Sequence, residues 1–456
     1  MKAIMKTLIG IGLIIGVYSC NKEDRLDYTL QNYDTFDPGV IDDWIAKNMT
    51  DLYNIEVIYR YQRNMHDINK NIAPAEESKV IPQMEVVQKG FLEVYGSVGG
   101  LPFIKEYTPK QFVLFGSGDY DPDGSVKGGT ADGGRRITLY GINGLNTENP
   151  NAVLGNLQVV HHEFTHILNQ MRMIPIDFEK ICVGDYYANW THWENTMELA
   201  RSLGFITPYA RKNVGEDFAE TLSHMIVRGQ LFYEKFAYDS GEEAYAKFKR
   251  KETLVRDYMT QNFKLDVTEL QMEFQKVMEN QYGSNAYTFG AAIDNNYIAS
   301  LDWDIRKDWA LTKNISEMQQ QVTQAILGGF GGWQTKTMEF RFVSNTEAML
   351  NISFGDSGTT YNAAYDFTIS KQEDGSYHIF EAEEQGTGTI YNNGQIDWVL
   401  AATQPFINYI GSTGFVLEWE TSVENTAPVD YLKYGVWKEV NDGEATLLGE
   451  VLLRSY

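Results

Sequence analysis

The sequence predicts an α+β protein in which a mixed helix and strand domain is followed by an all-β, antiparallel, sandwich-like domain. Short β-branched runs alternate with longer helix-period segments as far as residue 282, and helical patterns without proline dominate residues 216–279. From residue 329 onward, β-branched and aromatic residues alternate, and turn-forming clusters interrupt them about every 8–12 residues. This last pattern is typical of an antiparallel sandwich or barrel.

The elements of the first domain follow from these periodicities. Strands are expected at residues 55–61, 111–115 and 136–140. Helices are expected at residues 83–95, 153–171, 216–228, 241–259 and 267–279. Together these elements predict a first domain that covers residues 39–285.

The elements of the second domain are strands separated by turns. The strands are expected at residues 337–343, 364–369, 415–421 and 431–438. The turns are expected at residues 355–356, 374–375, 392–394 and 441–443. We place the domain boundary within residues 284–320 and the β-rich domain at residues 320–456.

The composition narrows the functional classes. The chain has 456 residues, of which 43% are hydrophobic and 22% charged, so wholesale disorder and a multi-span membrane protein are excluded. Lys and Arg number 38 against 62 Asp and Glu, and the net charge of −24 would repel phosphate backbones, so no nucleic-acid partner is expected. Two cysteines cannot build a disulfide framework.

Residues 1–20 have the order of a lipoprotein signal peptide. Lys2 and Lys6 precede an apolar run at residues 8–17 that is too short to span a bilayer, and a small-residue cleavage point ends at Cys20. We expect Cys20 to be lipidated and to become the mature N-terminus. The alternative is an ordinary secretory signal with an incidental cysteine.

Residues 21–38 are polar and are expected to form a tether. The first of them, Asn-Lys-Glu-Asp, resemble the tag that sends lipoproteins of Bacteroidota to the outer face of the outer membrane. This resemblance implies an outer membrane lipoprotein exposed on the cell surface. No later run reaches about 18 apolar residues, so the lipid would be its membrane anchor.

The most specific motif is H-E-x-x-H, formed by His162, Glu163 and His166 in a helical pattern. Positions i and i+4 share one face of a helix, so both imidazoles can bind one zinc ion per chain. Glu163 would then lie beside the metal, where it can accept a proton from water that the metal has acidified. His161 points elsewhere on the helix and is expected to support the site or to lie on the surface.

A catalytic zinc site needs a third protein ligand. The extended metzincin pattern would require Gly and His where this chain has Asn169 and Arg172, so that class is excluded. A carboxylate from a second helix is the other standard solution, and Glu216 and Glu220 share one helix face. One would bind zinc and the other would accept the N–H of a ligating histidine. Spacing alone ranks these two nearly level and leaves Asp185 and Glu194 open.

The segment from Tyr209 to Glu220 resembles the second half of the site in lethal-factor-like gluzincins, where E-x-F-A-E follows H-E-x-x-H. In that family the first glutamate of the motif is the metal ligand. The resemblance implies that Glu216 is the third zinc ligand and that Glu220 is the partner of a ligating histidine. It also implies that Tyr209 stabilises the oxyanion of the tetrahedral intermediate.

The signal peptide, the H-E-F-T-H helix and the E-D-F-A-E helix together resemble the zinc-binding metallopeptidase lipoproteins of Bacteroidota. The resemblance covers about residues 1–282 and implies a zincin-like fold for the first domain. That family is described as zinc metallohydrolases associated with substrate import. It implies a TonB-dependent importer and its surface lipoprotein as partners.

We therefore expect a cell-surface zinc metallopeptidase that hydrolyses amide bonds of peptide or protein substrates and is linked to nutrient import. The alternatives are a nutrient-capture lipoprotein with a vestigial zinc site and a zinc hydrolase of non-peptide substrates. The aromatic-rich C-terminal domain could serve carbohydrate or protein binding, although alternating aromatics are more often core.

Two weaker features lie between the first strands and the motif helix. Asp119, Asp121 and Asp123 before Gly124 resemble the start of an EF-hand, but the later ligand positions do not fit, so a solvated turn is expected. In gluzincin-like folds an edge strand before the zinc helix pairs with extended substrate, and residues 136–140 are the candidate for that strand.

Overall fold

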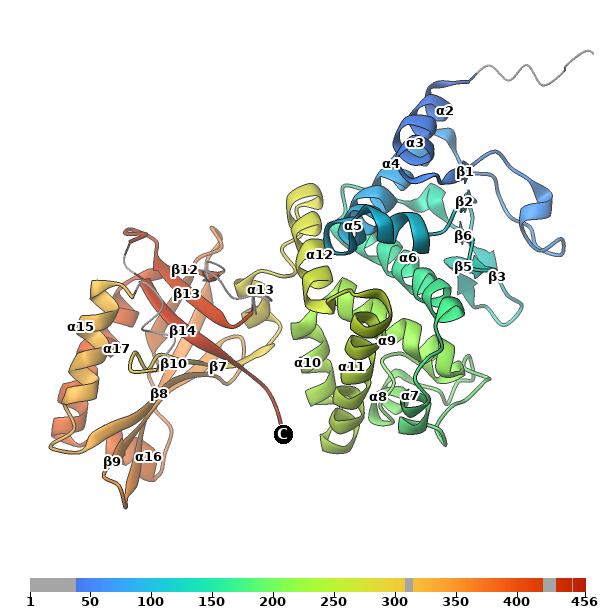
Figure 1. Cartoon of the computed structure of the whole chain (residues 1–456). Coiled ribbons are helices and arrows are strands. Elements are labelled where there is room, and N and C mark those ends of the chain that lie inside the picture. Colours follow the sequence, from blue (N-terminus) through green and yellow to red (C-terminus); the bar gives the residue numbers. More distant parts are fainter. Residues whose placement is uncertain (1–37, 308–314, 421–431, 445) are drawn as a thin grey trace, which may run out of the picture. The chain divides into compact units, whose positions relative to one another are not determined.

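The computed structural model describes residues 38–307, 315–420, 432–444 and 446–456. The expected signal peptide, Cys20 and nearly all of the tether lie outside the described residues. The described chain forms a mainly helical N-terminal domain and a C-terminal domain built on an antiparallel barrel (Figure 1). The α+β class is therefore confirmed. Within the described residues no helix combines the length and apolar character needed to cross a membrane.

The N-terminal domain contains a four-stranded sheet with the order β1-β2-β6-β5. Its strands are β1 (Glu56–Ile58), β2 (Gln111–Leu114), β5 (Gly129–Asp132) and β6 (Arg136–Leu139). The first three in sheet order are parallel, and β5 pairs antiparallel with β6. All three predicted strands are present. A short hairpin of β3 (Asp119–Tyr120) and β4 (Val126–Lys127) stands apart from this sheet.

Helices make up most of the N-terminal domain (Figure 1). They are α2 (Val40–Ile45), α3 (Asp51–Tyr53), α4 (Glu77–Val87), α5 (Glu93–Tyr107), α6 (Pro150–Met171), α7 (Ile176–Ile181), α8 (Met197–Ser202), α9 (Val214–Arg228), α10 (Gln230–Asp239), α11 (Glu242–Phe263) and α12 (Val267–Tyr282). Each of the five predicted helical segments falls within or across these helices. The segment at residues 83–95 lies in a longer run, because a π-helical stretch joins α4 to α5.

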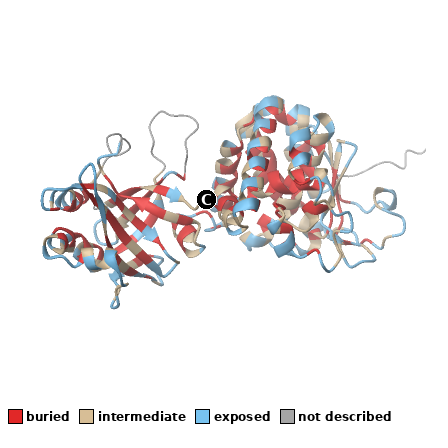
Figure 2. Cartoon of the chain, turned by 90° about the horizontal axis from the view of Figure 1, so that it is seen from below, coloured by how far each residue is buried: buried red, intermediate tan, exposed pale blue. Residues whose placement is uncertain are grey.

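Helices α6 and α9 pack against each other at the centre of this domain. Asn149 caps α6 by accepting a hydrogen bond from the backbone N–H of Asn151, and Pro150 occupies the first helical position. Most residues of α9 are buried. Figure 2 shows that buried, red segments lie in the interior of the helical part of the chain. Both helices are thus fixed by packing as well as by their caps.

The C-terminal domain contains a closed barrel of antiparallel strands with the order β10-β11-β12-β13-β14-β7-β8-β9. The strands are β7 (Ile298–Asp302), β8 (Gln334–Phe342), β9 (Glu347–Gly355), β10 (Thr360–Lys371), β11 (Tyr377–Glu381), β12 (Gly414–Trp419), β13 (Tyr434–Glu439) and β14 (Thr446–Leu453). The antiparallel prediction is confirmed, and of its two forms the barrel is the one observed. Closure results from pairing of β14 with β7, where Val451 lies opposite Leu301.

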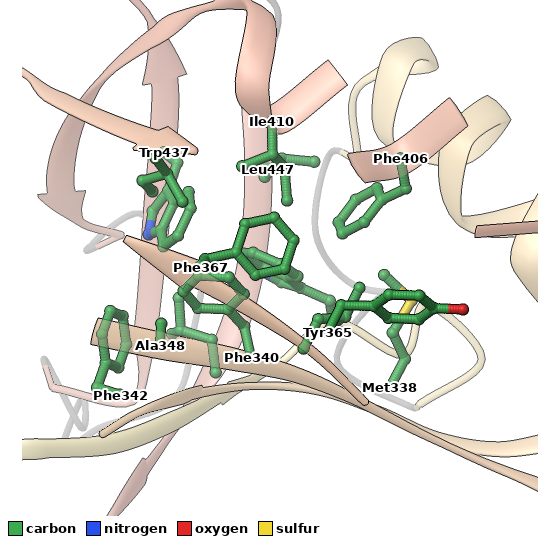
Figure 3. Packing of buried hydrophobic residues seen from close by; sticks show 14 of the residues in the cluster. Met338, Phe340, Phe342, Ala348, Tyr365, Phe367, Phe406, Ile410, Trp437 and Leu447 are labelled. Carbon is green, nitrogen blue, oxygen red and sulfur yellow. The ribbon is translucent and has the colours of Figure 1, made fainter. Parts of the chain in front are cut away.

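Large apolar side chains fill the barrel interior (Figure 3). Trp303 and Trp437 are fully buried, and their rings meet edge to face with centroids 4.9 Å apart. Phe340 contacts both of these rings from β8. The aromatic residues of this domain are therefore mainly core, because alternate positions of each strand face inward.

Helices also belong to the C-terminal domain, so it is not all-β. They are α13 (Phe289–Asp294), α15 (Glu317–Gly328), α16 (Thr389–Gly394) and α17 (Asp397–Ser412). The turn predicted at residues 392–394 lies in α16 and was wrong, because the Asn and Gly residues end a helix there. Strand β7 lies upstream of residue 320 and inside the predicted boundary region.

Candidate metal centre

Helix α6 presents two imidazoles on one face. The Nε2 atoms of His162 and His166 lie 3.1 Å apart, and the rings are nearly perpendicular. Glu216 faces them from the first turn of α9, where Asn213 caps the helix by accepting a hydrogen bond of 3.0 Å from the backbone N–H of Glu216. Glu216 Oε2 lies 3.2 Å from His162 Nε2 and 3.0 Å from His166 Nε2. Two helices thus bring three donor atoms to one point.

The donor set fits a zinc ion. Tetrahedral zinc with nitrogen and oxygen ligands at about 2.0–2.2 Å places neighbouring ligand atoms about 3.3 Å apart. The three observed separations of 3.0–3.2 Å are close to that value. With both imidazoles neutral and their protons on Nδ1, the two Nε2 atoms and the carboxylate oxygen would present lone pairs to one another, and a cation between them would stabilise that arrangement. The same three residues form the His-His-Glu group of the described chain that could hold a metal.

Glu220 contacts the other nitrogen of His162. Its Oε1 lies 2.8 Å from His162 Nδ1, and its Oε2 accepts a hydrogen bond of 2.8 Å from Thr207 Oγ1. A proton on Nδ1 leaves the Nε2 lone pair directed at the metal position. Spacing left Glu216 and Glu220 level, whereas the structure places Glu216 on the Nε2 side and Glu220 on the Nδ1 side.

The charges at the centre are strongly coupled. Burial opposes the charged form of His162, but the carboxylates of Glu216 and Glu220 outweigh it and raise the pKa of His162 to about 10. Burial would raise the pKa of Glu220, but hydrogen bonding to His162 lowers it to about 2. Hydrogen bonds from His162, His166 and Lys212 similarly hold the pKa of Glu216 below its usual range. Both glutamates are therefore anionic at neutral pH.

A buried ion pair fixes how α9 faces α6. Asp217 and Lys251 of α11 are both fully buried, and Lys251 Nζ lies 2.7 Å from Asp217 Oδ2. Tyr186 donates a further hydrogen bond of 3.0 Å to Asp217. Because Asp217 points toward α11, its neighbours Glu216 and Glu220 are directed toward the histidines.

Glu163 is 7% exposed and lines the same cavity as the histidines. Burial raises its pKa, and a hydrogen bond to the backbone of Ala131 opposes that shift. Ala131 lies on β5, which approaches α6 closely because Gly129 has no side chain. A Cβ atom at Gly129 would lie 2.6 Å from Val159 Cγ1 and 3.1 Å from Glu163 Cγ.

The edge strand beside α6 is β5, not the strand predicted at residues 136–140. Strand β6 (Arg136–Leu139) lies between β2 and β5, so its backbone groups are already paired on both sides. The prediction chose the wrong arm of a hairpin, because strand order depends on pairing with distant residues. Residues 128–131, in and next to β5, line the cavity.

Tyr209 lies in a short 3-10 turn just before α9. Its ring centroid is 5.9 Å from that of His162 and 4.8 Å from that of Trp190. Burial and the nearby carboxylate of Glu216 raise the pKa of Tyr209, so its phenol keeps its proton at neutral pH. The structure thus brings Tyr209 to the same cavity as the expected ligands and Glu163.

Sequence reasoning missed Lys212. Its Nζ lies 2.8 Å from Glu216 Oε1 and 3.3 Å from the Tyr209 hydroxyl, to which it donates. The spacing of Lys212 and Glu216 was the one signal available, since residues four apart can pair.

The cavity at the centre has a volume of about 620 Å³, which is within the usual range for ligand sites. The β3–β4 hairpin and the loop that carries Trp190 both contribute to it. Thr191 of that loop donates a hydrogen bond of 3.0 Å to Asp123 of the hairpin. Of the aspartates compared with an EF-hand, Asp119 lies in β3, and Asp121 and Asp123 lie in the turn between β3 and β4. Lys70 Nζ lies 3.0 Å from Asp119 Oδ1.

Three other candidates are not part of the centre. Asp185 accepts a hydrogen bond from Arg211 through its backbone oxygen, and the nearest charged partner of Glu194 is His192, so neither joins the metal group. His161 is fully buried, and its Nε2 lies 3.0 Å from the carbonyl oxygen of Gly90. The expectation of a supporting or surface role for His161 was wrong, because this side chain belongs to the apolar core.

The N-terminal part of the chain is similar to known proteins. A family model described as "Putative zinc-binding metallo-peptidase" matches residues 35–268. The chain is also similar to a crystal structure described as that of a putative zinc-binding metallo-peptidase from Bacteroides caccae. The identity is 26% and the TM-score 0.45, and the match covers 55% of this chain and 97% of the other. No curated protein matches.

Proposed function

The chain belongs to the family of "putative zinc-binding metallo-peptidases", and on that premise we propose that it hydrolyses amide bonds of peptides at a zinc centre held by His162, His166 and Glu216. The observation that carries the proposal is the convergence of His162 Nε2, His166 Nε2 and Glu216 Oε2 within 3.2 Å of one another. Three protein ligands leave a fourth position open, as a catalytic zinc site requires.

Three residues around the proposed ligands have a part in the proposed reaction. When bound, zinc supplies Lewis-acid chemistry that acidifies water and polarises a carbonyl group. Glu163 is the general base, and its raised pKa brings its proton affinity closer to neutral pH, where a base works best. Tyr209 keeps its proton and donates a hydrogen bond to the oxyanion that forms from the substrate carbonyl. Glu220 holds His162 in the tautomer that ligates through Nε2.

The cavity suits an extended peptide. Strand β5 is an edge of the sheet, and the part of it near Gly129 and Ala131 lies beside Glu163. An unpaired strand edge can add an extended chain through main-chain hydrogen bonds. A substrate paired in this way would present its backbone carbonyl to the metal position, which favours peptides over small non-peptide substrates.

The test uses the purified full-length protein and its Glu163→Gln variant. We expect about one zinc per chain in both by elemental analysis. The wild type should cleave a mixture of fluorogenic peptides, and the variant should be slower by roughly 10²-fold or more because it lacks the base. Glu179→Gln, on the exposed face of α7, is the matched control and should keep full activity. Absence of stoichiometric zinc, or undiminished hydrolysis by Glu163→Gln, would overturn the proposal.

We also propose that the protein is an outer membrane lipoprotein exposed on the cell surface and linked to an importer of nutrients. The support is the signal-like pattern that ends at Cys20 and the acidic residues that follow it. A Cys20→Ser variant should move from the detergent phase to the aqueous phase on phase partitioning of whole cells. Wild-type protein found in the aqueous phase would contradict the location.

A further inference from the structure

Lys212 has no part in the ligand set or in the roles assigned above, yet it contacts two residues of the centre. It precedes the cap of α9, and its Nζ lies 2.8 Å from Glu216 Oε1 and 3.3 Å from the hydroxyl oxygen of Tyr209. The ammonium group also lies 5.0 Å from the centroid of the Tyr209 ring. Lys212 therefore joins a proposed metal ligand to the proposed oxyanion donor.

The two oxygens of Glu216 have different partners. Oε2 faces both histidine nitrogens, whereas Oε1 faces the ammonium of Lys212. A lysine at one oxygen competes with a metal for the lone pairs of that oxygen and so favours metal binding through the other. Binding through both oxygens would occupy the coordination position that a catalytic site must leave open. The Lys212 contact therefore favours ligation through a single oxygen.

The contact with Tyr209 fixes the direction of the phenol proton. An ammonium group has donors and no acceptor, so the oxygen of Tyr209 must accept from Lys212. The hydroxyl proton of Tyr209 is then available to an acceptor other than Lys212. The Glu216 carboxylate is one such acceptor, and a substrate oxyanion would compete with it. A hydroxyl that accepts from a cation is also a stronger donor, because successive hydrogen bonds polarise one another.

The charge of the centre gives a further reason for a cation at this position. Glu163, Glu216 and Glu220 place three carboxylates within one cavity. Among the described residues, Lys212 is the Lys or Arg side chain within ion-pair distance of any of the three. Its side chain is 37% exposed, so water reaches it and the pair with Glu216 contributes mainly geometry.

We propose that Lys212 is a positioning residue that holds Glu216 in single-oxygen ligation and directs the hydroxyl of Tyr209 toward the substrate carbonyl. The inference rests on the proposed function and extends it to a residue outside the H-E-x-x-H and E-x-F-A-E motifs.

The first experiment measures zinc affinity by competition with a chromophoric chelator. Zinc binding to Lys212→Met and Lys212→Gln should weaken by about 10–100-fold, the usual effect of losing a partner that orients a metal ligand. Lys212→Arg should recover much of the loss, since it keeps a cationic donor. Lys180→Met, on an exposed part of α7, is the matched control and should bind zinc like the wild type.

The second experiment measures kcat and KM for a fluorogenic peptide at saturating zinc. Lys212→Met should lower kcat by about 10-fold or more with little change in KM, because the Tyr209 hydrogen bond matters most in the transition state. The same substitution in a Tyr209→Phe background should have a much smaller effect on kcat, since the group that Lys212 orients is already gone.

Each result bears on the inference. Wild-type zinc affinity and kcat in folded Lys212→Met or Lys212→Gln would overturn it, and so would effects that add fully with those of Tyr209→Phe. If the Met variant misfolds, as circular dichroism would show, the Gln and Arg variants decide the outcome. Failure of the wild type to bind zinc or cleave peptides would instead overturn the proposed function.

Discussion

At the scale of single residues, His162 is the most constrained side chain of the centre, because its two ring nitrogens face two different glutamates. Nε2 lies 3.2 Å from Glu216 Oε2, and Nδ1 lies 2.8 Å from Glu220 Oε1. The glutamates are four residues apart on α9, but their roles differ. Glu216 faces the nitrogen that would ligate zinc, whereas Glu220 faces the other nitrogen and orients the ring.

Substitution of Glu220 tests whether Glu216 is the metal ligand and Glu220 the residue that orients His162. Glu220→Gln keeps the shape of the side chain but removes the charge that favours a proton on His162 Nδ1. We expect zinc affinity to fall about 10-fold and the fold to be retained, whereas Glu216→Gln should lose more affinity because a ligand is removed. Chelator competition measures both. Equal losses in the two variants, or a larger loss for Glu220→Gln, would contradict the assignment.

The sequence could predict the local part of the site and not the rest. His162, Glu163 and His166 follow from helical spacing, since residues four apart share a face. Glu216 and Glu220 have that same relation, so spacing cannot rank them, and only the resemblance to gluzincins favoured Glu216. Lys212 carries no such motif, because its role depends on a fold that brings it beside Tyr209.

At the scale of elements, the approach of β5 to α6 controls the shape of the cavity. Gly129 allows the strand to lie against Val159 and beside Glu163. Gly155, within α6 itself, has no atom within 4 Å of an added Cβ and is exposed. An added methyl group would therefore clash at Gly129 and would meet only solvent at Gly155.

Two alanine substitutions test whether the close approach of β5 to α6 determines the shape of the cavity. Gly129→Ala should lower kcat/KM by about 10-fold or more, because a 2.6 Å contact with Val159 forces β5 or Glu163 to move. Gly155→Ala should leave activity unchanged and raise the free energy of unfolding by about 0.5–1 kcal/mol, since alanine favours a helix interior. Peptide hydrolysis and urea denaturation provide the measurements. Full activity in Gly129→Ala would contradict the close approach.

Periodicity found the long elements and missed those that depend on distant partners. The 22-residue helix α6 has a sustained apolar face and was predicted from residue 153 onward. Strand β5 has only four residues, and two glycines directly precede or begin it, so no pattern marked it. Helix α17 lies among strands, where the β-rich pattern concealed its 3.6-residue period, and α15 lies next to the predicted domain boundary, where no element was predicted.

At the scale of the whole molecule, zinc should stabilise one domain only. The three proposed ligands all belong to the N-terminal domain, and the barrel has its own aromatic core. A ligand that binds the folded form alone adds stability that grows with its concentration, about 4 kcal/mol at a thousandfold excess over the dissociation constant. The same measurement tests the two-domain organisation predicted from the sequence, because only the domain that holds the ligands should respond to zinc.

Calorimetry of the full-length protein should show two transitions, of which one falls to lower temperature when a chelator removes zinc. The other should stay in place, because it reports the barrel. A chelator already saturated with zinc is the control and should leave both transitions unchanged. A single transition, or an equal shift of two, would show that the domains unfold together and would contradict the prediction.

Closure of the barrel is the part of the architecture that the sequence could least predict. The first and last barrel strands, β7 and β14, begin at Ile298 and Thr446, so local pattern cannot reveal that they pair. The alternation of apolar and polar residues is the same in an open sandwich and in a barrel. Only the pairing of distant strands distinguishes the two.

That closure has a consequence for how copies of the chain meet one another at high local concentration. An open sheet exposes a row of unpaired backbone groups, which can template addition of a strand from a neighbouring molecule and start aggregation. The barrel strands pair in a closed ring, so they offer no such template. In the N-terminal sheet, by contrast, β1 and β5 are edges, and β5 borders the cavity. Among the described sheets, the open edges therefore lie in the N-terminal domain, and at β5 an added strand would be a peptide in the cavity rather than a neighbouring copy.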